Sequence, residues 1–464
     1  MRGRKLGSNG KKFEEKYPGV RSFVSFRREA GGGFVFNPYL YGEKWLNEVE
    51  YCVLELSNGT RSVSEIIESV SKIFALNRCD ASDLVCRILM DLESYCALRW
   101  REKPISKPDP LVPPSTIRNG TDYYSAPSSV LWYLTYNCNM KCKHCLVGDL
   151  PPTREMSLDE AKYVLGELKR MKIFSINFSG GEPLLRPDLL EIIRAGSEMH
   201  FGMILSTNGL SLNQDILNKL KDSDVYQYQI SLDGIGEIHD EFRGVKGGYE
   251  KALNALSMVS RSGLHAIMST MITMKNIHQI GELLELASSL GVSTFKLNAF
   301  MPHGRGRKNK DELKVPNEML RALAIELAEK KERYKDTMNI QLDSLSPWLL
   351  EKEQDSSIII KGSTDCRLRC SAGQTTLVLA PDGAIFSCPY LTDFPLGNVL
   401  TDSLHGIWNN NSGILGKFRK IEQNDLMGKC RNCKYVPTRC NGGCRAAAYL
   451  EVGDFYGEDP LCWK

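Results

Sequence analysis

Fifteen of the 464 residues are cysteines, and three of them stand close together. Cys138, Cys142 and Cys145 have the spacing C-x3-C-x2-C. Three thiolates on one loop can hold three irons of a cubane iron–sulfur cluster, which leaves the fourth iron open to bind a small molecule. The alternative is a zinc site with a distant fourth ligand, for which His144 is a candidate. The sequence favours the iron–sulfur cluster, because zinc ligation by a residue inside this loop would be strained.

A second group of eight cysteines lies within the last hundred residues. It comprises Cys366, Cys370, Cys388, Cys430, Cys433, Cys440, Cys444 and Cys462. This region has little periodicity, so we expect it to have a small apolar core and to need metal for stability. One interpretation is a zinc ribbon, since Cys430-x2-Cys433 with Cys440-x3-Cys444 can hold one zinc unaided.

The composition excludes several classes of protein. With 42% hydrophobic and 25% charged residues, the chain has the composition of a globular protein. The chain contains no apolar stretch of about 18 residues, so no membrane span is predicted. The basic start of the chain lacks the apolar segment of a secretory signal. We therefore expect a cytoplasmic protein, where cysteine clusters more often bind metal than form disulfides. A net charge of +3, from 59 basic and 56 acidic residues, predicts no nucleic-acid partner.

The elements that position the first cysteines lie in residues 129–305, where short apolar runs alternate with amphipathic helical stretches. Six runs predict strands: Val130–Leu134, Ile173–Phe178, Met203–Leu205, Tyr226–Leu232, Ala266–Ile272 and Thr294–Phe300. Helical stretches such as Leu158–Met171 lie between them, which predicts an α/β fold with a parallel sheet and helices outside it. Six units suggest a partial (β/α)6 barrel, with the site at the C-terminal ends of the strands.

Residues 31–103 predict a small α+β domain of winged-helix type. Phe34–Phe36 reads as a strand, three helices follow, and Cys96–Trp100 reads as a closing strand. Trp45 and Leu46 open the first helical pattern, and Ser62 with Glu65 forms a capping box for the second helix. This region holds the other four cysteines, Cys52, Cys79, Cys86 and Cys96. They lack ligand spacing, so we expect buried packing residues.

The remaining segments connect these parts. Residues 1–30 are interpreted as a basic tail, residues 104–128 as a Pro-rich linker and residues 306–360 as a helical connector. Residues 361–464 form the Cys-rich C-terminal domain.

A glycine-rich turn, Gly180-Gly181-Glu182-Pro183, follows the second predicted strand. Together with the cysteine motif it resembles the radical S-adenosylmethionine (SAM) superfamily, and the resemblance covers roughly residues 129–305. It implies that the three-cysteine cluster binds SAM and that this turn binds the amino group of its methionine part. Glycines allow close backbone approach, and the Glu182 carboxylate attracts an ammonium.

Further positions match the family's cofactor contacts. Ser206-Thr207-Asn208-Gly209 follows the third predicted strand, and Thr207 and Asn208 are implied SAM contacts. Ser231 and Asp233 match positions near the cofactor ribose and carboxylate. The resemblance implies that Arg243 pairs with the methionine carboxylate. Residues 297–305 resemble the last barrel strand, which packs near the adenine.

The cysteines of the tail resemble the SPASM extension of the same superfamily, which holds two auxiliary [4Fe-4S] clusters. The resemblance implies one closed set, which we call set A: Cys366, Cys370, Cys388 and Cys444. It implies a second closed set, set B: Cys430, Cys433, Cys440 and Cys462. Six residues separate Cys433 from Cys440 where the family has five, which puts that loop in doubt. The chain is therefore expected to bind SAM and three [4Fe-4S] clusters, which implies a low-oxygen setting.

The N-terminal region resembles the peptide-recognition element of ribosomal-peptide maturases, which has the fold of the pyrroloquinoline-quinone peptide chaperone. The match begins at Gly33–Pro38 and ends at Trp100. In relatives a leader peptide adds a strand to the edge of the sheet. A winged helix that binds DNA is the alternative, and the acidic helices argue against it.

These resemblances imply an enzyme that modifies a ribosomally made precursor peptide. Reductive cleavage of SAM would give a 5′-deoxyadenosyl radical, which takes hydrogen from a core residue. The product would be a thioether or carbon–carbon crosslink, or a fragmentation. A flavodoxin or ferredoxin is the implied electron donor. No general base is evident, because Tyr390, Asp382 and His303 are interpreted as structural.

Three alternatives remain open. The first is a sulfatase-maturase-like oxidase of Ser or Cys, which Pro389 weakens because those relatives have Asp after the auxiliary-cluster cysteine. The second is a haem- or cofactor-pathway radical SAM enzyme, which would not need the N-terminal region. The third is a non-catalytic iron–sulfur or zinc scaffold that binds peptides, which would need neither the glycine-rich turn nor an open iron.

Overall fold

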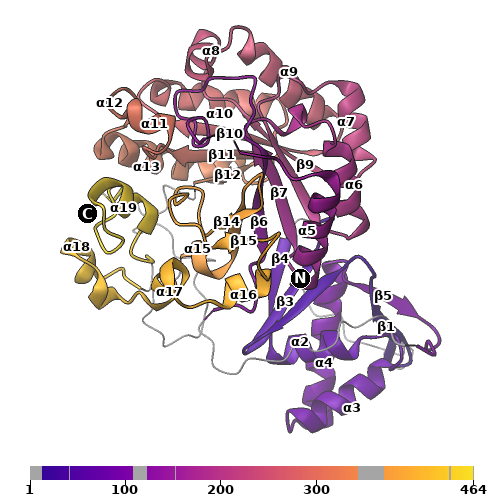
Figure 1. Cartoon of the computed structure of the whole chain (residues 1–464). Coiled ribbons are helices and arrows are strands. Elements are labelled where there is room, and N and C mark those ends of the chain that lie inside the picture. The colour runs from indigo at the N-terminus through magenta and orange to yellow at the C-terminus, as the bar shows by residue number, and fades with distance from the viewer. Residues whose placement is uncertain are drawn as a thin grey trace. The chain divides into compact units, whose positions relative to one another are not determined.

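The structure is a computed structural model that describes residues 13–40, 42–107, 123–151, 153–342, 370–437 and 440–462. Contacts divide the chain into two compact units (Figure 1). The N-terminal unit comprises Met1–Ser125 with His200–Gly202, and the barrel unit comprises Ala126–Met199 with Met203–Lys464. Among the described residues, no helix is long and apolar enough to cross a membrane.

A single sheet organises the barrel unit. Its strands follow the order β12-β11-β10-β9-β8-β7-β6-β13-β14-β15. The bounds are β6 Ser129–Thr135, β7 Ser175–Gly180, β8 Gly202–Thr207, β9 Gln227–Ser231, β10 His265–Ile272, β11 Thr294–Ala299, β12 Asn339–Gln341, β13 Thr376–Leu379, β14 Ala384–Phe386 and β15 Gly397–Asn398. The pairs β6–β7, β8–β9, β9–β10 and β10–β11 are parallel. The predicted α/β class with a mostly parallel sheet is confirmed, and all six predicted strands are present.

Helices follow most of these strands, and α5, α6 and α7 lie along one face of the sheet (Figure 1). The helix bounds are α5 Leu158–Arg170, η1 Pro183–Leu185, α6 Leu189–Glu198, α7 Gln214–Lys221, α8 Glu237–Arg243, α9 Gly248–Arg261, η2 Ile277–Gln279, α10 Ile280–Ser289, α11 Arg305–Lys308, α12 Lys310–Leu313 and α13 Asn317–Tyr334. Ser157 starts α5 with a capping box to Glu160, as the S-x-x-E pattern predicts. Such a cap typically stabilises by about 1 kcal/mol.

The C-terminal region joins the barrel sheet. Strand β13 pairs in parallel with β6, with Thr376 opposite Ser129. Its helices are α15 Ser371–Gln374, α16 Leu404–Asn409, α17 Gly413–Lys420, η4 Gln423–Asp425, α18 Gly428–Arg431 and α19 Arg445–Val452. The prediction of a small apolar core there is wrong, because Leu391, Phe418 and Phe455 belong to a buried apolar cluster against which several cysteines pack. Of the predicted helical connector, residues 343–360 lie outside the described residues.

Two small sheets and three helices build the N-terminal unit. Strands β1 (Tyr17–Val20) and β5 (Leu98–Arg101) pair antiparallel, and β2 (Ser25–Glu29), β3 (Gly32–Asn37) and β4 (Gly42–Asn47) form a three-stranded sheet. The helices are α2 Glu48–Leu56, α3 Val63–Ile73 and α4 Arg78–Ser94. Their apolar faces share one buried core.

Three expectations for this unit need correction. Strands β1 and β2 lie inside the predicted basic tail, and Arg27 of β2 is buried beside Glu29 rather than solvated. Trp45 and Leu46 belong to β4, since Asn47 caps α2 through a capping box with Glu50. Of the predicted linker, residues 108–122 lie outside the described residues.

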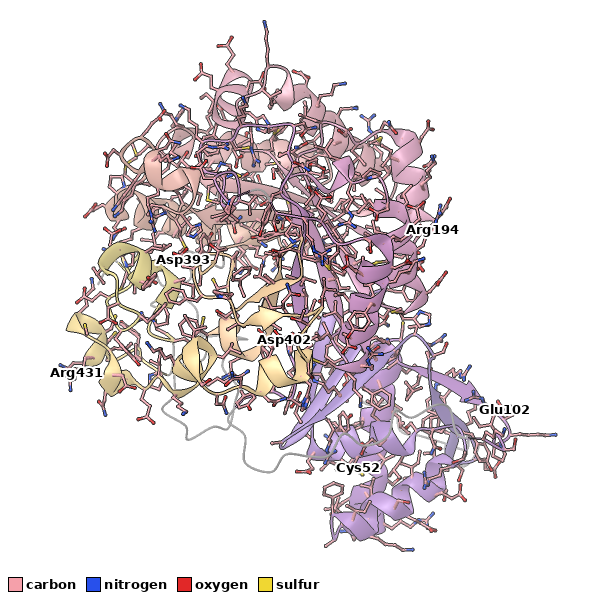
Figure 2. The ribbon with its side chains drawn as sticks, in the orientation of Figure 1. Cys52, Glu102, Arg194, Asp393, Asp402 and Arg431 are labelled. Atoms are coloured by element: carbon pink, nitrogen blue, oxygen red, sulfur yellow. The ribbon has the colours of Figure 1, made fainter. Side chains whose placement is uncertain are left out.

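The four cysteines of the N-terminal unit are only partly buried. Cys86 is buried, and Cys52, labelled on α2 in Figure 2, is half-buried. Cys79 and Cys96 are exposed, so the expectation that they are buried is wrong. Cys79 lies in the first turn of α4, and Cys96 has a positive φ of 53° just after that helix. The exposure of these cysteines depends on where each one lies relative to α4, and the residue type alone does not reveal that.

Candidate active site

The three predicted cluster ligands lie on an irregular loop of residues 136–151, which follows β6. Cys142 is 7% exposed, whereas Cys138 is the most open of the three. Burial, with smaller contributions from the thiols of Cys142 and Cys145, raises the pKa of Cys138 to about 11. All three cysteines therefore lie on one loop at the C-terminal end of the first barrel strand.

This donor set fits an iron–sulfur cluster better than a zinc ion. Thiols crowded in a partly buried site need a cation to become thiolates, and cluster iron supplies that charge. Within the described ranges, no three His, Cys, Asp or Glu side chains converge closely enough for a single metal ion. The His144 ring stacks on Phe242 with centroids 4.6 Å apart, and burial lowers its pKa to about 4. His144 therefore packs against a ring and does not complete a zinc site.

The glycine-rich turn packs against the start of the cysteine loop. Gly180 has φ +136°, and a Cβ there would lie 2.2 Å from the Thr135 carbonyl oxygen. A Cβ on Gly181 would lie 2.2 Å from the carbonyl oxygen of Asn137. The backbone N–H groups of Gly181 and Glu182 donate to Thr135 and Asn137 at 2.7 and 2.8 Å. Glycine is required because a side chain would separate the two loops.

Glu182 also has a role within the protein, and its contact with SAM stays a prediction. Its side chain is fully buried, and it accepts hydrogen bonds from the Thr207 hydroxyl (2.7 Å) and the N–H groups of Asn208 (2.8 Å) and Leu184 (3.1 Å). Burial raises the pKa of this carboxyl, and the three donors oppose that rise. The carboxylate thus ties the β7 turn to the end of β8, and protein donors already occupy both of its oxygens.

Asn208 lies beside the cysteine loop, and Thr207 next to it donates to Glu182. The Asn208 side-chain amide donates to Asn139 at 2.7 Å and lies 3.9 Å from the Cys138 sulfur. Pro183 begins the short helix η1 after the turn, and Ser231 ends β9 opposite Ser269. Contacts of these side chains with SAM stay predictions.

A buried ion pair stands behind the cysteine loop. Arg243 Nε and Nη2 both contact Asp233 Oδ2, and Arg243 Nη1 lies 3.7 Å from the Cys142 sulfur. Asp233 also accepts from the Met271 N–H at 2.7 Å. Burial works to raise the pKa of Asp233, but the charge of Arg243 outweighs it and holds that pKa below its usual range. In this structure Arg243 faces a carboxylate and a cysteine, which leaves other guanidinium protons for a ligand.

The end of α8 carries the loop itself. Lys141 N–H donates to the Arg243 carbonyl at 3.1 Å, and Lys143 N–H donates to the Phe242 carbonyl at 3.0 Å. A Cβ on Gly244 would lie 2.9 Å from the Lys141 carbonyl oxygen. The predicted cofactor residues Asp233 and Arg243 thus share one rigid support with the cysteines.

The C-terminal cysteines fall into two neighbourhoods. In set A, burial and the thiols of Cys444 and Cys370 raise the pKa of Cys388, and burial raises the pKa of Cys444 to about 12. Cys366 lies outside the described residues. These neighbourhoods follow the interleaved pattern, in which Cys444 lies with Cys370 and Cys388.

Set B forms the other neighbourhood. Burial, together with the thiols of Cys462 and Cys430, raises the pKa of Cys440 to about 11. Cys433 is one hydrogen-bonded turn from Cys430. Arg431, between these two cysteines, projects into solvent from α18 (Figure 2). In set B Cys430 is buried and the other three cysteines are half-buried. The ligand roles of both sets stay predictions.

Two buried residues that the sequence reasoning missed hold this region together. Arg445, next to Cys444, donates to the carbonyls of Phe455 (3.0 Å) and Gly457 (2.8 Å). Asp459 accepts from the Cys444 N–H at 2.7 Å. The sequence does carry one signal for Arg445, which is a charged residue directly after the predicted ligand Cys444.

The three polar residues considered as bases differ in setting. Asp382 accepts from the Thr153 hydroxyl at 2.8 Å and from the Ala384 N–H at 3.1 Å, as a structural turn residue would. Tyr390 is packed in the core around set A, and the His303 ring meets it edge-on at 6.1 Å. Burial raises the pKa of Tyr390 and lowers that of His303.

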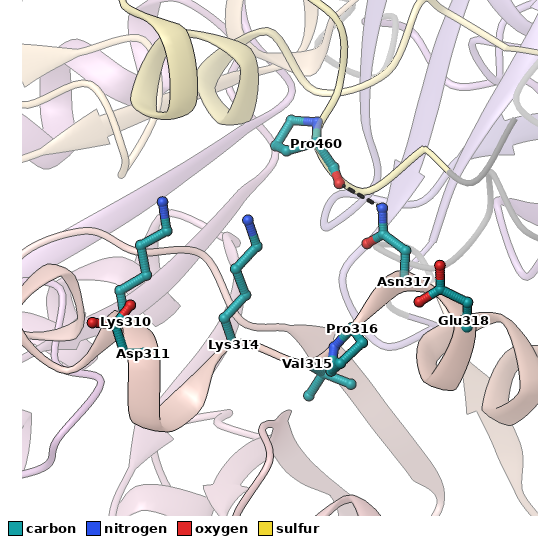
Figure 3. Close-up of a pocket in the computed structure, with 8 residues that line it drawn as sticks. All are labelled: Lys310, Asp311, Lys314, Val315, Pro316, Asn317, Glu318 and Pro460. Carbon is teal, nitrogen blue, oxygen red and sulfur yellow. Dashed lines mark hydrogen bonds between the residues drawn. The ribbon is translucent and has the colours of Figure 1, made fainter.

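A surface hollow of about 450 Å³ lies elsewhere, beside α12 and the start of α13 (Figure 3). Lys310 and Lys314 project from one wall, and Asn317 donates to the Pro460 carbonyl at 2.9 Å. Glu451 pairs with both lysines. The hollow contains none of the predicted cofactor contacts, so it is distinct from the candidate active site.

Comparison with known proteins agrees with this arrangement. The model of the Radical SAM superfamily matches residues 132–287, and that of the SPASM iron–sulfur cluster-binding domain matches residues 370–434. The chain is 33% identical over 344 residues to the mycofactocin maturase MftC of Mycolicibacterium smegmatis, which covers 73% of this chain and 83% of that protein. It is 31% identical over 343 residues to an AdoMet-dependent heme synthase of Methanosarcina barkeri, over 73% of this chain and 97% of that protein.

Among solved structures, SuiB of Streptococcus suis bound to S-adenosylmethionine has a TM-score of 0.69 at 16% identity. The match covers 96% of this chain and 100% of SuiB, so both share the fold. The chain is 33% identical to the mycofactocin maturase MftC over 83% of that protein. It therefore belongs to the radical SAM superfamily, has a C-terminal SPASM domain, and uses SAM and iron–sulfur clusters as cofactors.

Proposed function

We propose that this chain matures a ribosomally made precursor peptide and that its N-terminal unit holds the leader of that peptide. The observation that carries the proposal is the presence of that unit in addition to the catalytic domains. The SuiB structure with its precursor peptide SuiA covers 96% of this chain at a TM-score of 0.67. The heme synthase and mycofactocin maturase alignments each cover 73% of it. The mycofactocin maturase adds sequence similarity to a peptide-pathway enzyme.

The residues of the barrel unit would prepare the reaction. Cys138, Cys142 and Cys145 would hold the SAM-binding cluster, and sets A and B would hold two closed clusters. When bound, SAM and its cluster supply the radical that removes hydrogen from the peptide. Arg243 and Asp233 fix the cysteine loop and offer a buried cation beside it. The product is a crosslink, thioether or carbon–carbon, or a fragmentation.

The N-terminal unit, which we propose to be winged-helix-like, offers a strand edge for the leader. Among the described strands, β4 pairs with β3 alone and ends the three-stranded sheet. Helix α4 lies beside it, because Lys44 pairs with Asp91 and the Tyr95 hydroxyl donates to the Gly42 carbonyl. Leu40, in the turn before β4, and Met90, next to Asp91 on α4, are 49% and 48% exposed. An extended peptide can add backbone hydrogen bonds to such an edge and place apolar side chains on these residues.

Deletion of residues 1–103 should abolish binding of the leader, because it removes the whole proposed recognition element. In the full chain, Leu40→Asp with Met90→Asp should weaken binding about tenfold or more, since about 1.4 kcal/mol corresponds to a factor of ten. Fluorescence anisotropy with a labelled leader of the precursor peptide measures both effects.

The control for the point variants is Ile73→Asp, which places one aspartate on another exposed apolar site, 59% exposed, at the end of α3. Iron content and SAM cleavage without peptide should stay unchanged in all of them. Unchanged leader affinity in the deletion variant would exclude the recognition role.

We further propose a small one-electron carrier, a flavodoxin or ferredoxin, as the electron donor and the cytoplasm as the location. The second candidate function is haem biosynthesis, which the match over 97% of a heme synthase favours. That function would leave the N-terminal unit without a task, so peptide maturation is the better account.

A further inference from the structure

We propose that Arg305 is a positioning residue that holds the three-cysteine loop in its cluster-binding shape. It acts from the segment of residues 300–309 after β11, which we call the strap. The inference rests on the proposed role of Cys138, Cys142 and Cys145 as ligands of the SAM-binding cluster.

One arginine reaches several acceptors on this loop. Its Nη1 donates to the Cys142 carbonyl at 3.1 Å, and its Nη2 donates to the Gly148 carbonyl at 3.0 Å. Its Nε lies 3.4 Å from Asp149 Oδ1, and its backbone N–H donates to the Cys145 carbonyl at 3.0 Å. The fixed fork of a guanidinium suits such divergent acceptors, whereas an ammonium reaches fewer of them at once.

Neighbours of Arg305 complete the contact. Asn309 donates from its side chain to the Lys143 carbonyl at 2.8 Å. A Cβ on Gly304 would lie 2.4 Å from the Leu146 carbonyl oxygen, and the φ of Gly304 is +53°. The strap therefore approaches the loop backbone to a distance that glycine alone allows at this position.

The cysteine loop depends on such contacts, because residues 136–151 contain no helix or strand. The loop has no strand partners, and its backbone is held from two sides. Carbonyls at the end of α8 accept from its N–H groups, and side chains of the strap donate to its carbonyls. Without Arg305 the carbonyls on either side of Cys145 lose their shared donor. The distance between the sulfur atoms of Cys142 and Cys145 would then vary over a wider range.

The strap also reaches toward set A. Met301 belongs to the apolar core against which Cys370 and Cys388 pack, and His303 lies edge-on to Tyr390. One short segment thus contacts both the cysteine loop and the core of the C-terminal region. This position explains how Arg305 can affect the shape of the cysteine loop although it is far from the cysteine motif in sequence.

The test compares Arg305→Gln, Arg305→Lys and Lys308→Gln in the anaerobically reconstituted full chain. Lys308 is the matched control, since it pairs with the same Asp149 at 2.8 Å but is 75% exposed. We measure the rate of iron loss to a chelator and the change that SAM produces in the EPR signal of the reduced protein.

We expect Arg305→Gln to lose the SAM-sensitive EPR signal about 10- to 100-fold faster, the range typical of residues that orient metal ligands. Arg305→Lys should be intermediate and Lys308→Gln unchanged. Equal rates in Arg305→Gln and the unsubstituted protein would overturn the proposal, as would equal effects in Arg305→Gln and Lys308→Gln. Loss of all three clusters in Arg305→Gln would show a general folding role and would overturn it too.

A separate variant distinguishes failure of this inference from failure of the proposed function. If Cys142→Ala keeps the SAM-sensitive EPR signal, the ligand assignment itself is wrong. If Cys142→Ala loses it while Arg305→Gln keeps it, the assignment stands and the role of Arg305 is rejected.

Discussion

Cys142→Ala should lower the formation of 5′-deoxyadenosine from SAM by more than about 100-fold, because even residues that merely orient metal ligands contribute 10- to 100-fold. Cys142 is the middle cysteine of the motif, is 7% exposed and faces Arg243 across 3.7 Å. Its loss removes one of three ligands and leaves a buried cation beside an apolar methyl group. Chromatography of the anaerobic reaction with dithionite as reductant measures the product.

Cys79→Ala serves as the matched control. Cys79 is exposed in the first turn of α4 and belongs to no ligand set. This variant should form 5′-deoxyadenosine at the rate of the unsubstituted protein. Continued formation in Cys142→Ala would refute the assignment of the reactive cluster to these cysteines.

The division of the C-terminal cysteines predicts how iron content responds to paired substitutions. The unsubstituted chain should hold about twelve irons, from three cubane clusters of four. Cys370→Ala with Cys444→Ala affects set A alone and should leave about eight irons. Cys440→Ala with Cys444→Ala affects both sets and should leave about four irons, although these residues are close in sequence.

Colorimetric iron analysis of anaerobically reconstituted protein distinguishes this pattern from a zinc ribbon. A ribbon made of Cys430, Cys433, Cys440 and Cys444 would place Cys440 and Cys444 in one site. Both double variants would then cost that same single zinc site, because each removes Cys444, and their iron contents would be equal. About four irons in the unsubstituted chain would contradict both auxiliary clusters.

Much of the barrel was predictable from the sequence, because its strands are short apolar runs in a regular alternation with helices. The strands β6, β7 and β10 begin and end within two residues of the predicted runs. Parallel strands in such a sheet bring their C-terminal ends to one edge, which places the cysteine loop beside Glu182 and Asn208. Local pattern and fold rules were sufficient here.

Other features depend on partners that are remote in sequence. The pairing of β13 with β6 joins residues 247 positions apart, as the Ser129–Thr376 contact shows. The roles of Glu182 and Arg305 follow from which groups fold against them, and neither residue type nor spacing reveals those groups. Trp45 and Leu46 fit a helical pattern, but the cap at Asn47 starts the helix after them.

The central claim is that this chain directs SAM-derived radical chemistry at a peptide. Its most direct test uses the reconstituted full-length protein with dithionite, SAM and the precursor peptide, followed by mass spectrometry. The account predicts that 5′-deoxyadenosine and a peptide of altered mass appear together and in equal amounts. An unchanged peptide alongside consumption of a haem precursor would contradict it.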